Sequence, residues 1–450
     1  MQKVMSYIRN YYGITAVIIM ISAILSYSLS YFFVTSENHK AAEMYIGELK
    51  YSVTLNSIVT NSIAISPGEH LFMVNVKNLN NVATKYKLVY ESNPNLNVVY
   101  YPTTEDAAGV VKTYSKSADS IALNTTNNVK VKVENKATTK QTISFKAIGG
   151  YDINDVSTIT VPSGYTAILP ETDKYYFCYT GKLLKNGLTY SSGQYEYKYR
   201  YGATTPLRSG FTTWDSNLLE EAGWGVQAVN PKNITDVLGG KICSYIDDMP
   251  IVSMQYMYAN RRDDTINIKN FRSNSVTSME GMFSGAKAKN MIGLANLNTS
   301  SVKNMSSLFS GSKVTSISGL TSWDTSNVTD MSGMFSNIVA SSLDLTGFNT
   351  KNVTTMQAMF ERAGVSATSK ITINGLTSFD TSNVINMTYM FGSSNVETLD
   401  LSSFEINENA KITGMFNLTS ATTIYVKDEN TKKLLGSIAA NPNTLEFIVK

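Results

Sequence analysis

The chain contains few side chains suited to acid–base chemistry or metal binding. It has two histidines, His39 and His70, and two cysteines, Cys178 and Cys243, in 450 residues. This scarcity disfavours zinc modules and histidine-based catalysis. Charge is also sparse, since 38 basic residues offset 35 acidic ones and no basic face is evident, which argues against a nucleic-acid partner. We therefore predict a non-enzymatic protein with no cofactor and no metal site.

One long apolar run stands out near the N-terminus. Ile14 to Val34 contains no charged residue, and at about 1.5 Å per helical residue it would cross the roughly 30 Å apolar layer of a bilayer. Lys3 and Arg9 precede it and favour a cytoplasmic N-terminus. We predict a cytoplasmic tail over 1–13, a transmembrane signal anchor over 14–34 and a single-pass protein whose bulk is extracellular. Whether this segment is cleaved stays open.

Residues 35–161 alternate apolar and polar side chains, as in HLFMVNVKN and NVKVKVEN, with Asn-rich and Thr-rich turns between them. A period of two predicts antiparallel strands with one face buried. The pattern resembles the immunoglobulin-like sandwiches that space bacterial surface proteins, and we expect such a β-sandwich stalk here. A jelly roll is the alternative.

Residues 162–250 are rich in aromatic side chains, including Trp214 and Trp224. We interpret them as the core of a small β module or connector, although such rings could also stack on sugars. The carboxylate pairs Glu220–Glu221 and Asp247–Asp248 are poor candidates for a glycosidase dyad, because adjacent residues of a strand point to opposite faces.

Cys178 and Cys243 could form one disulfide in an oxidising compartment. It would close a loop of 243 − 178 = 65 residues, and in the chain-entropy picture it would contribute about 4 kcal/mol. Two buried free thiols are the alternative.

Residues 251–420 contain a repeated motif. Five clear copies read FRSNSVTSMEGMF, LNTSSVKNMSSLF, WDTSNVTDMSGMF, FNTKNVTTMQAMF and FDTSNVINMTYMF, and weaker copies end at Tyr258 and Phe416. The closing aromatic residues recur after 25, 26, 26, 25, 31 and 25 residues. A period of this length over about seven units predicts a solenoid.

Each copy places apolar side chains at i, i+3, i+6 and i+7, within about 120° of a helix circumference. A Ser or Asn that can cap a helix precedes the first of them, and short alternating stretches upstream predict strands. We therefore expect α/β repeats whose helical stripe faces the core, with methionine as a packing residue and not a copper ligand. The predicted N-caps are Ser275, Ser301, Asn327, Asn352 and Asn383. The predicted repeat core is Val276, Met279, Met282, Phe283, Val302, Met305, Leu308, Phe309, Val328, Met331, Met334, Phe335, Val353, Met356, Met359, Phe360, Val384, Met387, Met390 and Phe391.

The motif resembles the BspA-like leucine-rich repeats of bacterial surface proteins, which also occur in mycoplasma surface proteins. The resemblance covers the repeats, and residues 421–450 look like the capping segment that ends such arrays. It implies adhesion, or binding to a host or bacterial surface protein or glycan, and carries no catalytic residues. The predicted fold is thus multidomain: a transmembrane helix, an Ig-like sandwich stalk and an α/β leucine-rich-repeat-like solenoid. A glycan-active enzyme with its site in 162–250 and a structural envelope component remain alternatives.

Overall fold

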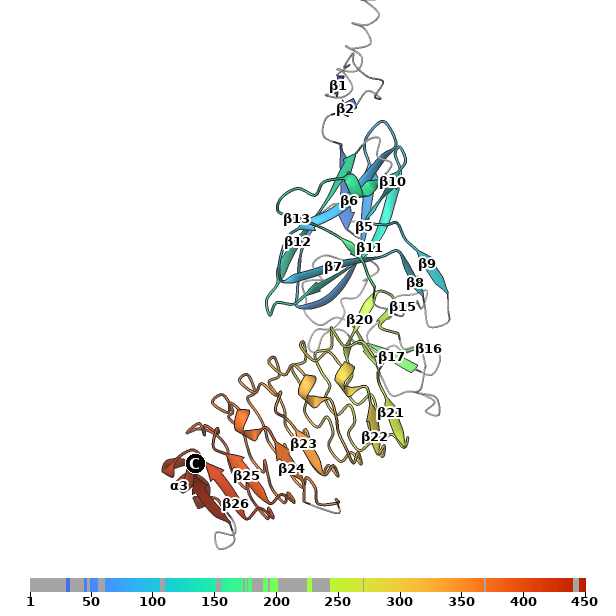
Figure 1. Cartoon of the computed structure of the whole chain (residues 1–450). Helices are drawn as coiled ribbons and strands as arrows, with labels where there is room; N and C mark the ends of the chain where they lie inside the picture. Colours follow the sequence, from blue (N-terminus) through green and yellow to red (C-terminus); the bar gives the residue numbers. More distant parts are fainter. Residues whose placement is uncertain are drawn as a thin grey trace, which may run out of the picture.

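The fold is described from a computed structural model of the chain. The structure describes residues 30–32, 44–46, 49–55, 61–105, 110–150, 155–172, 175, 177–179, 189–192, 195–200, 225–228, 243–269, 271–367, 370–439 and 445–450. Within these residues a β-sandwich, a mixed sheet and a stack of repeats follow one another along the chain (Figure 1).

The sandwich forms because its strands alternate apolar and polar side chains. In β11 (Thr126–Asn135), Val129, Val131 and Val133 are fully buried and share one core cluster with Tyr86 and Phe145 of the other sheet. The first sheet has the order β10 (Ala118–Ile121), β6 (Thr84–Glu91), β12 (Gln141–Gly150), β4 (Ser62–Ile65), with β13 (Tyr165–Ala167) also on β6. The second has the order β14 (Leu169–Pro170), β7 (Leu96–Tyr101), β11, β5 (Gly68–Asn78), β3 (Tyr51–Leu55). The hairpin β8 (Thr103–Glu105) and β9 (Val111–Thr113) and the 3-10 helix η1 (Val156–Thr158) complete this part.

A mixed sheet connects the sandwich to the repeats. Its strand β20 (Met249–Ser253) is buried throughout and pairs with strands on both sides. The same strand begins the repeat stack, because Ser253 forms a parallel bridge with Ser278. The sheet has the order β15 (Phe177–Cys178), β19 (Tyr245–Ile246), β20, β18 (Gly225–Ala228), β17 (Tyr195–Arg200), β16 (Thr189–Ser192).

The repeats stack in parallel, each about one strand spacing from the next. One bridge per repeat joins Ser253, Ser278, Asn304, Asp330, Thr355, Asn386 and Lys411 in sequence. Other elements of the stack are β21 (Thr265–Asn267), β22 (Asn290–Ile292), β23 (Ser342–Asp344), β24 (Thr372–Asn374), β25 (Thr398–Leu401), β26 (Thr423–Val426), β27 (Glu446–Val449), the 3-10 helices η2 (Leu294–Asn296), η3 (Leu320–Ser322) and η4 (Leu376–Ser378), and the helix α3 (Glu429–Ser437).

The predicted helix in each repeat is wrong. Between the last two core positions before the closing aromatic, every repeat has a residue in the left-handed region, for example Gly333 with a φ of 61° and Ser307 with a φ of 54°. An α-helix cannot continue through such a residue. The segment is instead a run of turns, in which Met334 N donates to Met331 O and Ser336 N donates to Gly333 O.

The predicted α/β leucine-rich-repeat-like solenoid is therefore also wrong. In the described part of the repeats the strands pair only in twos and threes, as β21 with β22, β23 with β24, and β25 with β26 and β27. No sheet runs along the whole stack there, because neighbouring repeats elsewhere are joined by single bridges and turns. The helix α3 lies after the last repeat.

The predicted membrane anchor is corrected as well. Most of residues 14–34 lie outside the described residues, but Ser30–Phe32 form strand β1, which pairs with β2 (Met44–Ile46). Because Ser30–Phe32 form a strand, the predicted helix through residue 34 is wrong. Aromatic side chains such as Tyr31 and Phe32 favour strands. Among the described residues, no helix has the length and apolar character needed to cross a bilayer. The single-pass localisation that we predicted from this helix is corrected with it.

Candidate interaction surface

The repeat interior is a column of apolar side chains. All twenty residues of the predicted repeat core have 0% exposure. The closing aromatic rings lie nearly parallel, with centroids 5.7 Å apart from Phe309 to Phe335 and again from Phe335 to Phe360. These offset stacks add to the hydrophobic stabilisation that burial supplies. The methionines therefore pack in the core of the described repeats.

The turn segment of each repeat, which we call the ribbon, satisfies its own backbone. Alternate N–H groups point to the next repeat: those of Met305, Ser307, Phe309 and Gly311 donate to carbonyl oxygens of the following unit at 2.7 to 2.9 Å. Several N–H groups between them close turns within the unit, as Leu308 N does to Met305 O. The backbone thus supplies a ladder of hydrogen bonds between neighbouring repeats that does not depend on the ribbon side chains.

The predicted N-caps have another role. Three of the five use the side-chain amide to donate to the preceding repeat, as Asn352 Nδ2 does to Ser326 O at 2.7 Å. Ser301 Oγ donates to Asn274 O at 2.9 Å in the same way. Ser275 Oγ accepts from Glu69 N at 2.9 Å, so it joins the first full repeat to the sandwich. Asn327 and Asn383 make the bonds that match Asn352.

A second polar ladder runs in the opposite direction. The buried Thr325 Oγ1 donates to Asn349 O at 3.0 Å, and Thr350 Oγ1 donates to Asp380 O at 2.8 Å. The hydrogen bond that each buried hydroxyl forms offsets the free energy that its desolvation costs. Thr299 and Thr381 make the equivalent bonds. The two ladders fix each repeat against both of its neighbours.

The side chains of the ribbon form regular surface rows, which together we call the ribbon face. A polar row runs along it, and Asn386 Nδ2 donates to Gln357 Oε1 at 3.0 Å across one repeat interface. The polar row consists of Gln255, Glu280, Ser306, Ser332, Gln357, Thr388 and Thr413. The adjoining row, which we call the left-handed row, holds the left-handed residue that lies just before the closing pair of core residues in each repeat. It consists of Tyr256, Gly281, Ser307, Gly333, Ala358, Tyr389 and Gly414. A second left-handed residue follows the closing aromatic of each repeat, as Gly311 and Leu418 do.

Two exposed tyrosines occupy the left-handed row. Tyr256 has a φ of 54° and is 48% exposed, and Tyr389 has a φ of 56° and is 40% exposed. The Tyr256 hydroxyl donates to Glu280 Oε1 at 2.6 Å, and this carboxylate raises the pKa of the hydroxyl. Gln255 Nε2 also donates to Glu280, at 3.1 Å. The carboxylate is thus held in place at one end of the ribbon face.

A buried charged cluster holds the stack to the sandwich. Glu69 of β5 accepts hydrogen bonds from Tyr245 at 2.5 Å and from Asn274 of the first full repeat at 2.7 Å. Lys132 of β11 lies 2.6 Å from Glu171 and 3.6 Å from Glu69. The adjacent cavity has a volume of about 40 Å³, which is large enough for water but not for a larger ligand.

The charges of this cluster are set by burial and by unequal pairing. Burial raises the pKa of Glu69, and the nearby Lys132 opposes the effect. Burial alone would lower the pKa of Lys132, but the surrounding carboxylates and Tyr175 raise it. We infer that Lys132 stays charged because its closer partner is Glu171, which leaves Glu69 only partly compensated. Alternation alone would have placed Lys132 on the solvent side of the sheet.

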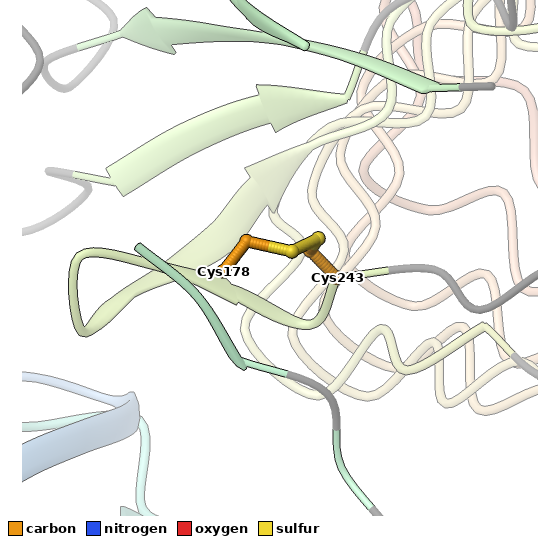
Figure 2. The surroundings of a disulfide bond; sticks show 2 residues. All are labelled: Cys178 and Cys243. Carbon is orange, nitrogen blue, oxygen red and sulfur yellow. A yellow bond between two sulfur atoms is a disulfide. The ribbon is translucent and has the colours of Figure 1, made fainter. Parts of the chain in front are cut away.

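Cys178 and Cys243 form a disulfide. Figure 2 shows it linking strand β15 to the segment that leads into β19. Both cysteines are 1% exposed, and the bond joins the two ends of a connecting region with a sequence separation of 65. It lies beside the strand that begins the repeat stack, since β19 pairs with β20.

The other sequence candidates do not form a site in the described residues. Trp214, Trp224 and Glu220–Glu221 lie outside them. Asp247 and Asp248 form the tight turn between β19 and β20, each with a positive φ, and Asp248 pairs with the buried Lys130. Among the described residues, no group of three or more histidine, cysteine, aspartate or glutamate side chains is placed to hold a metal ion.

The repeats are similar to one described family. A family model described as "Mycoplasma protein of unknown function, DUF285" matches residues 252–374 and 366–438. This match agrees with the mycoplasma side of the resemblance and does not extend to BspA-like leucine-rich repeats. Neither the curated proteins nor the solved structures gave a match.

Proposed function

We propose that the protein is a cell-surface interaction protein whose ribbon face binds an extracellular partner. The observation that carries this proposal is that the groups holding the stack together differ from those that face the solvent. Core, ladder and backbone bonds hold the stack, and the ribbon face presents side chains that vary from repeat to repeat. A rigid surface with variable side chains at constant spacing is what repeat proteins use for binding.

Two further observations support the proposal. The buried disulfide is of a kind that persists in oxidising compartments outside the cytosol. The charged cluster at Glu69 and the shared strand β20 join the repeats to the sandwich, so that the face is presented in a fixed orientation. Fixed orientation lowers the entropic cost of binding.

The test compares two arginine pairs in the full chain. Gln357→Arg with Thr388→Arg alters the ribbon face, and Thr372→Arg with Asn374→Arg adds the same charge on β24. Each protein is titrated against immobilised extracellular-matrix proteins, bacterial surface fractions and glycans. We expect the wild type and the β24 variant to give the same saturable binding and the ribbon variant to lose it. Equal binding by both variants would contradict the proposal.

A further inference from the structure

The two tyrosines of the left-handed row are the least expected residues on the ribbon face. Five of the seven positions in this row hold Gly, Ser or Ala, and Gly meets the positive φ without strain. A bulky side chain in the left-handed region is a genuine outlier. Strained residues that persist in a structure are frequently part of a binding or catalytic site.

Each tyrosine ring packs against a glycine of the following repeat. A Cβ atom added to Gly414 would lie 2.5 Å from Tyr389 Cε1, and one added to Gly281 would lie 2.3 Å from Tyr256 Cε1. The rings therefore occupy the space that a side chain would fill at these glycines. Because each ring also remains 40% exposed or more, it is a fixed aromatic platform at the surface.

The platforms lie five repeats apart on one row. At about 4.8 Å per parallel step this separation is roughly 24 Å. The intervening positions Gly281, Ser307, Gly333 and Ala358 carry no bulky side chain. Beside them runs the polar row, in which Glu280, Ser332 and Gln357 carry hydrogen-bonding groups. Ser332 Oγ donates to Asp330 Oδ1, and Gln357 Oε1 accepts from Asn386 Nδ2.

We propose that the ribbon face binds a neutral polysaccharide laid along the repeat axis, with the Tyr256 and Tyr389 rings as stacking platforms. The CH groups of a pyranose face pack on an aromatic ring, and the sugar hydroxyls match the polar row. The repeat spacing is close to the length that one pyranose adds to an extended chain. The polar row from Gln255 to Thr413 has one acidic residue and no basic one, so the recognition relies on hydrogen bonds and stacking. This inference rests on the proposed function and names its partner class.

The experiment measures binding of the full chain to three hexasaccharides by calorimetry: β-1,4-linked glucose, β-1,4-linked N-acetylglucosamine and β-1,3-linked glucose. Tyr256→Gly and Tyr389→Gly remove the platforms and also relieve the left-handed strain, so folding is retained. Leu418→Gly is the matched control, because Leu418 is also exposed and left-handed, with a φ of 53°, but lies in another row. The thermal midpoint of each variant is recorded in parallel.

We expect at least one hexasaccharide to bind, each tyrosine variant to lose about tenfold in affinity, and Leu418→Gly to bind as the wild type does. Tyr256→Phe should bind nearly as well as the wild type, because it keeps the ring and loses only the bond to Glu280. The matching disaccharide should bind more weakly than the hexasaccharide, since it cannot reach both rings.

Unchanged affinity in both glycine variants would overturn the platform assignment. Absence of binding by all three hexasaccharides at millimolar concentration would overturn the glycan assignment. In either case, capture of a protein partner that the arginine pair on the ribbon face abolishes would leave the proposed function standing. The two failures are therefore distinguishable.

Discussion

Replacing Gly333 by alanine tests the backbone of the repeats, because the two descriptions of this segment predict opposite signs. The side-chain spacing of the motif indicates an α-helix, where Gly→Ala in the interior stabilises by about 1 kcal/mol. In the structure Gly333 is left-handed, with a φ of 61°. Alanine in that region costs about 1–2 kcal/mol.

Three contributions determine how much Gly333→Ala changes the free energy of unfolding. An added Cβ would lie 3.3 Å from Ser307 Oγ and 4.0 Å from Ser336 Cβ, so Ser307 Oγ has to move by a few tenths of an ångström. Because this atom ends a short side chain that can rotate, we expect backbone strain to supply most of the cost. Alanine also restricts the unfolded chain, which offsets about 0.4–1 kcal/mol of the cost. We expect Gly333→Ala to lower the free energy of unfolding by about 1 kcal/mol. In a helix the same substitution would raise it by about 1 kcal/mol, so the two descriptions differ by about 2 kcal/mol.

The assay is urea unfolding of the full chain, with the midpoint compared at constant slope. Ala358→Gly is the reciprocal control, because Ala358 occupies the same row with a φ of 54°. It should raise the midpoint or leave it unchanged, whereas in a helix it would lower it. A higher midpoint for Gly333→Ala together with a lower one for Ala358→Gly would refute the left-handed turn.

Three further predictions concern the core, the disulfide and the junction. Phe335→Ala should lower the free energy of unfolding by about 3–5 kcal/mol, and Phe335→Leu by less. Equal urea midpoints for the two variants would contradict the buried stack of aromatic rings. Replacing Cys178 and Cys243 by serine should cost about 4 kcal/mol, and thiol titration of the unreduced wild type should detect no free thiol. Burial lowers the pKa of His70 to about 4 from 6.5, so the unfolded state takes up the proton first and stability should fall as the pH drops from 6.5 towards 4, by up to about 3 kcal/mol. His70→Gln should flatten that decline in a pH series of urea midpoints, and an unchanged slope would exclude His70 as its source.

The buried stripe of the repeats was predictable from the sequence, but its backbone was not. Spacing at i, i+3, i+6 and i+7 fits a helix, and it also fits consecutive turns that close after three residues, as Met334 N to Met331 O does. The difference was encoded in Gly281 and Gly333, which lie mid-motif where a helix disfavours glycine. The spacing of the apolar side chains does not depend on these glycines, so it predicts a helix in spite of them.

The junction was unpredictable for a different reason. Lys132 alternates with the core valines of β11, so the pattern places it on the solvent side of a half-buried sheet. The structure covers that side with Tyr175 and Tyr245, whose positions in sequence carry no sign of it. Local periodicity reports which side chains share a face, and only the tertiary arrangement decides what covers that face.

The support of Tyr389 by Gly414 leads to a last prediction that separates strain from steric conflict. Gly414 and Gly333 have nearly the same φ, 64° and 61°, so backbone strain alone would make their alanine variants equally unstable. An alanine at 414 would also meet the Tyr389 ring at 2.5 Å, so Gly414→Ala should lose more stability, by roughly 1–3 kcal/mol. Combining it with Tyr389→Gly should remove this excess, because the two changes share one contact. If the excess persists in the double variant, the ring does not rest on Gly414, and the aromatic platform loses its structural basis.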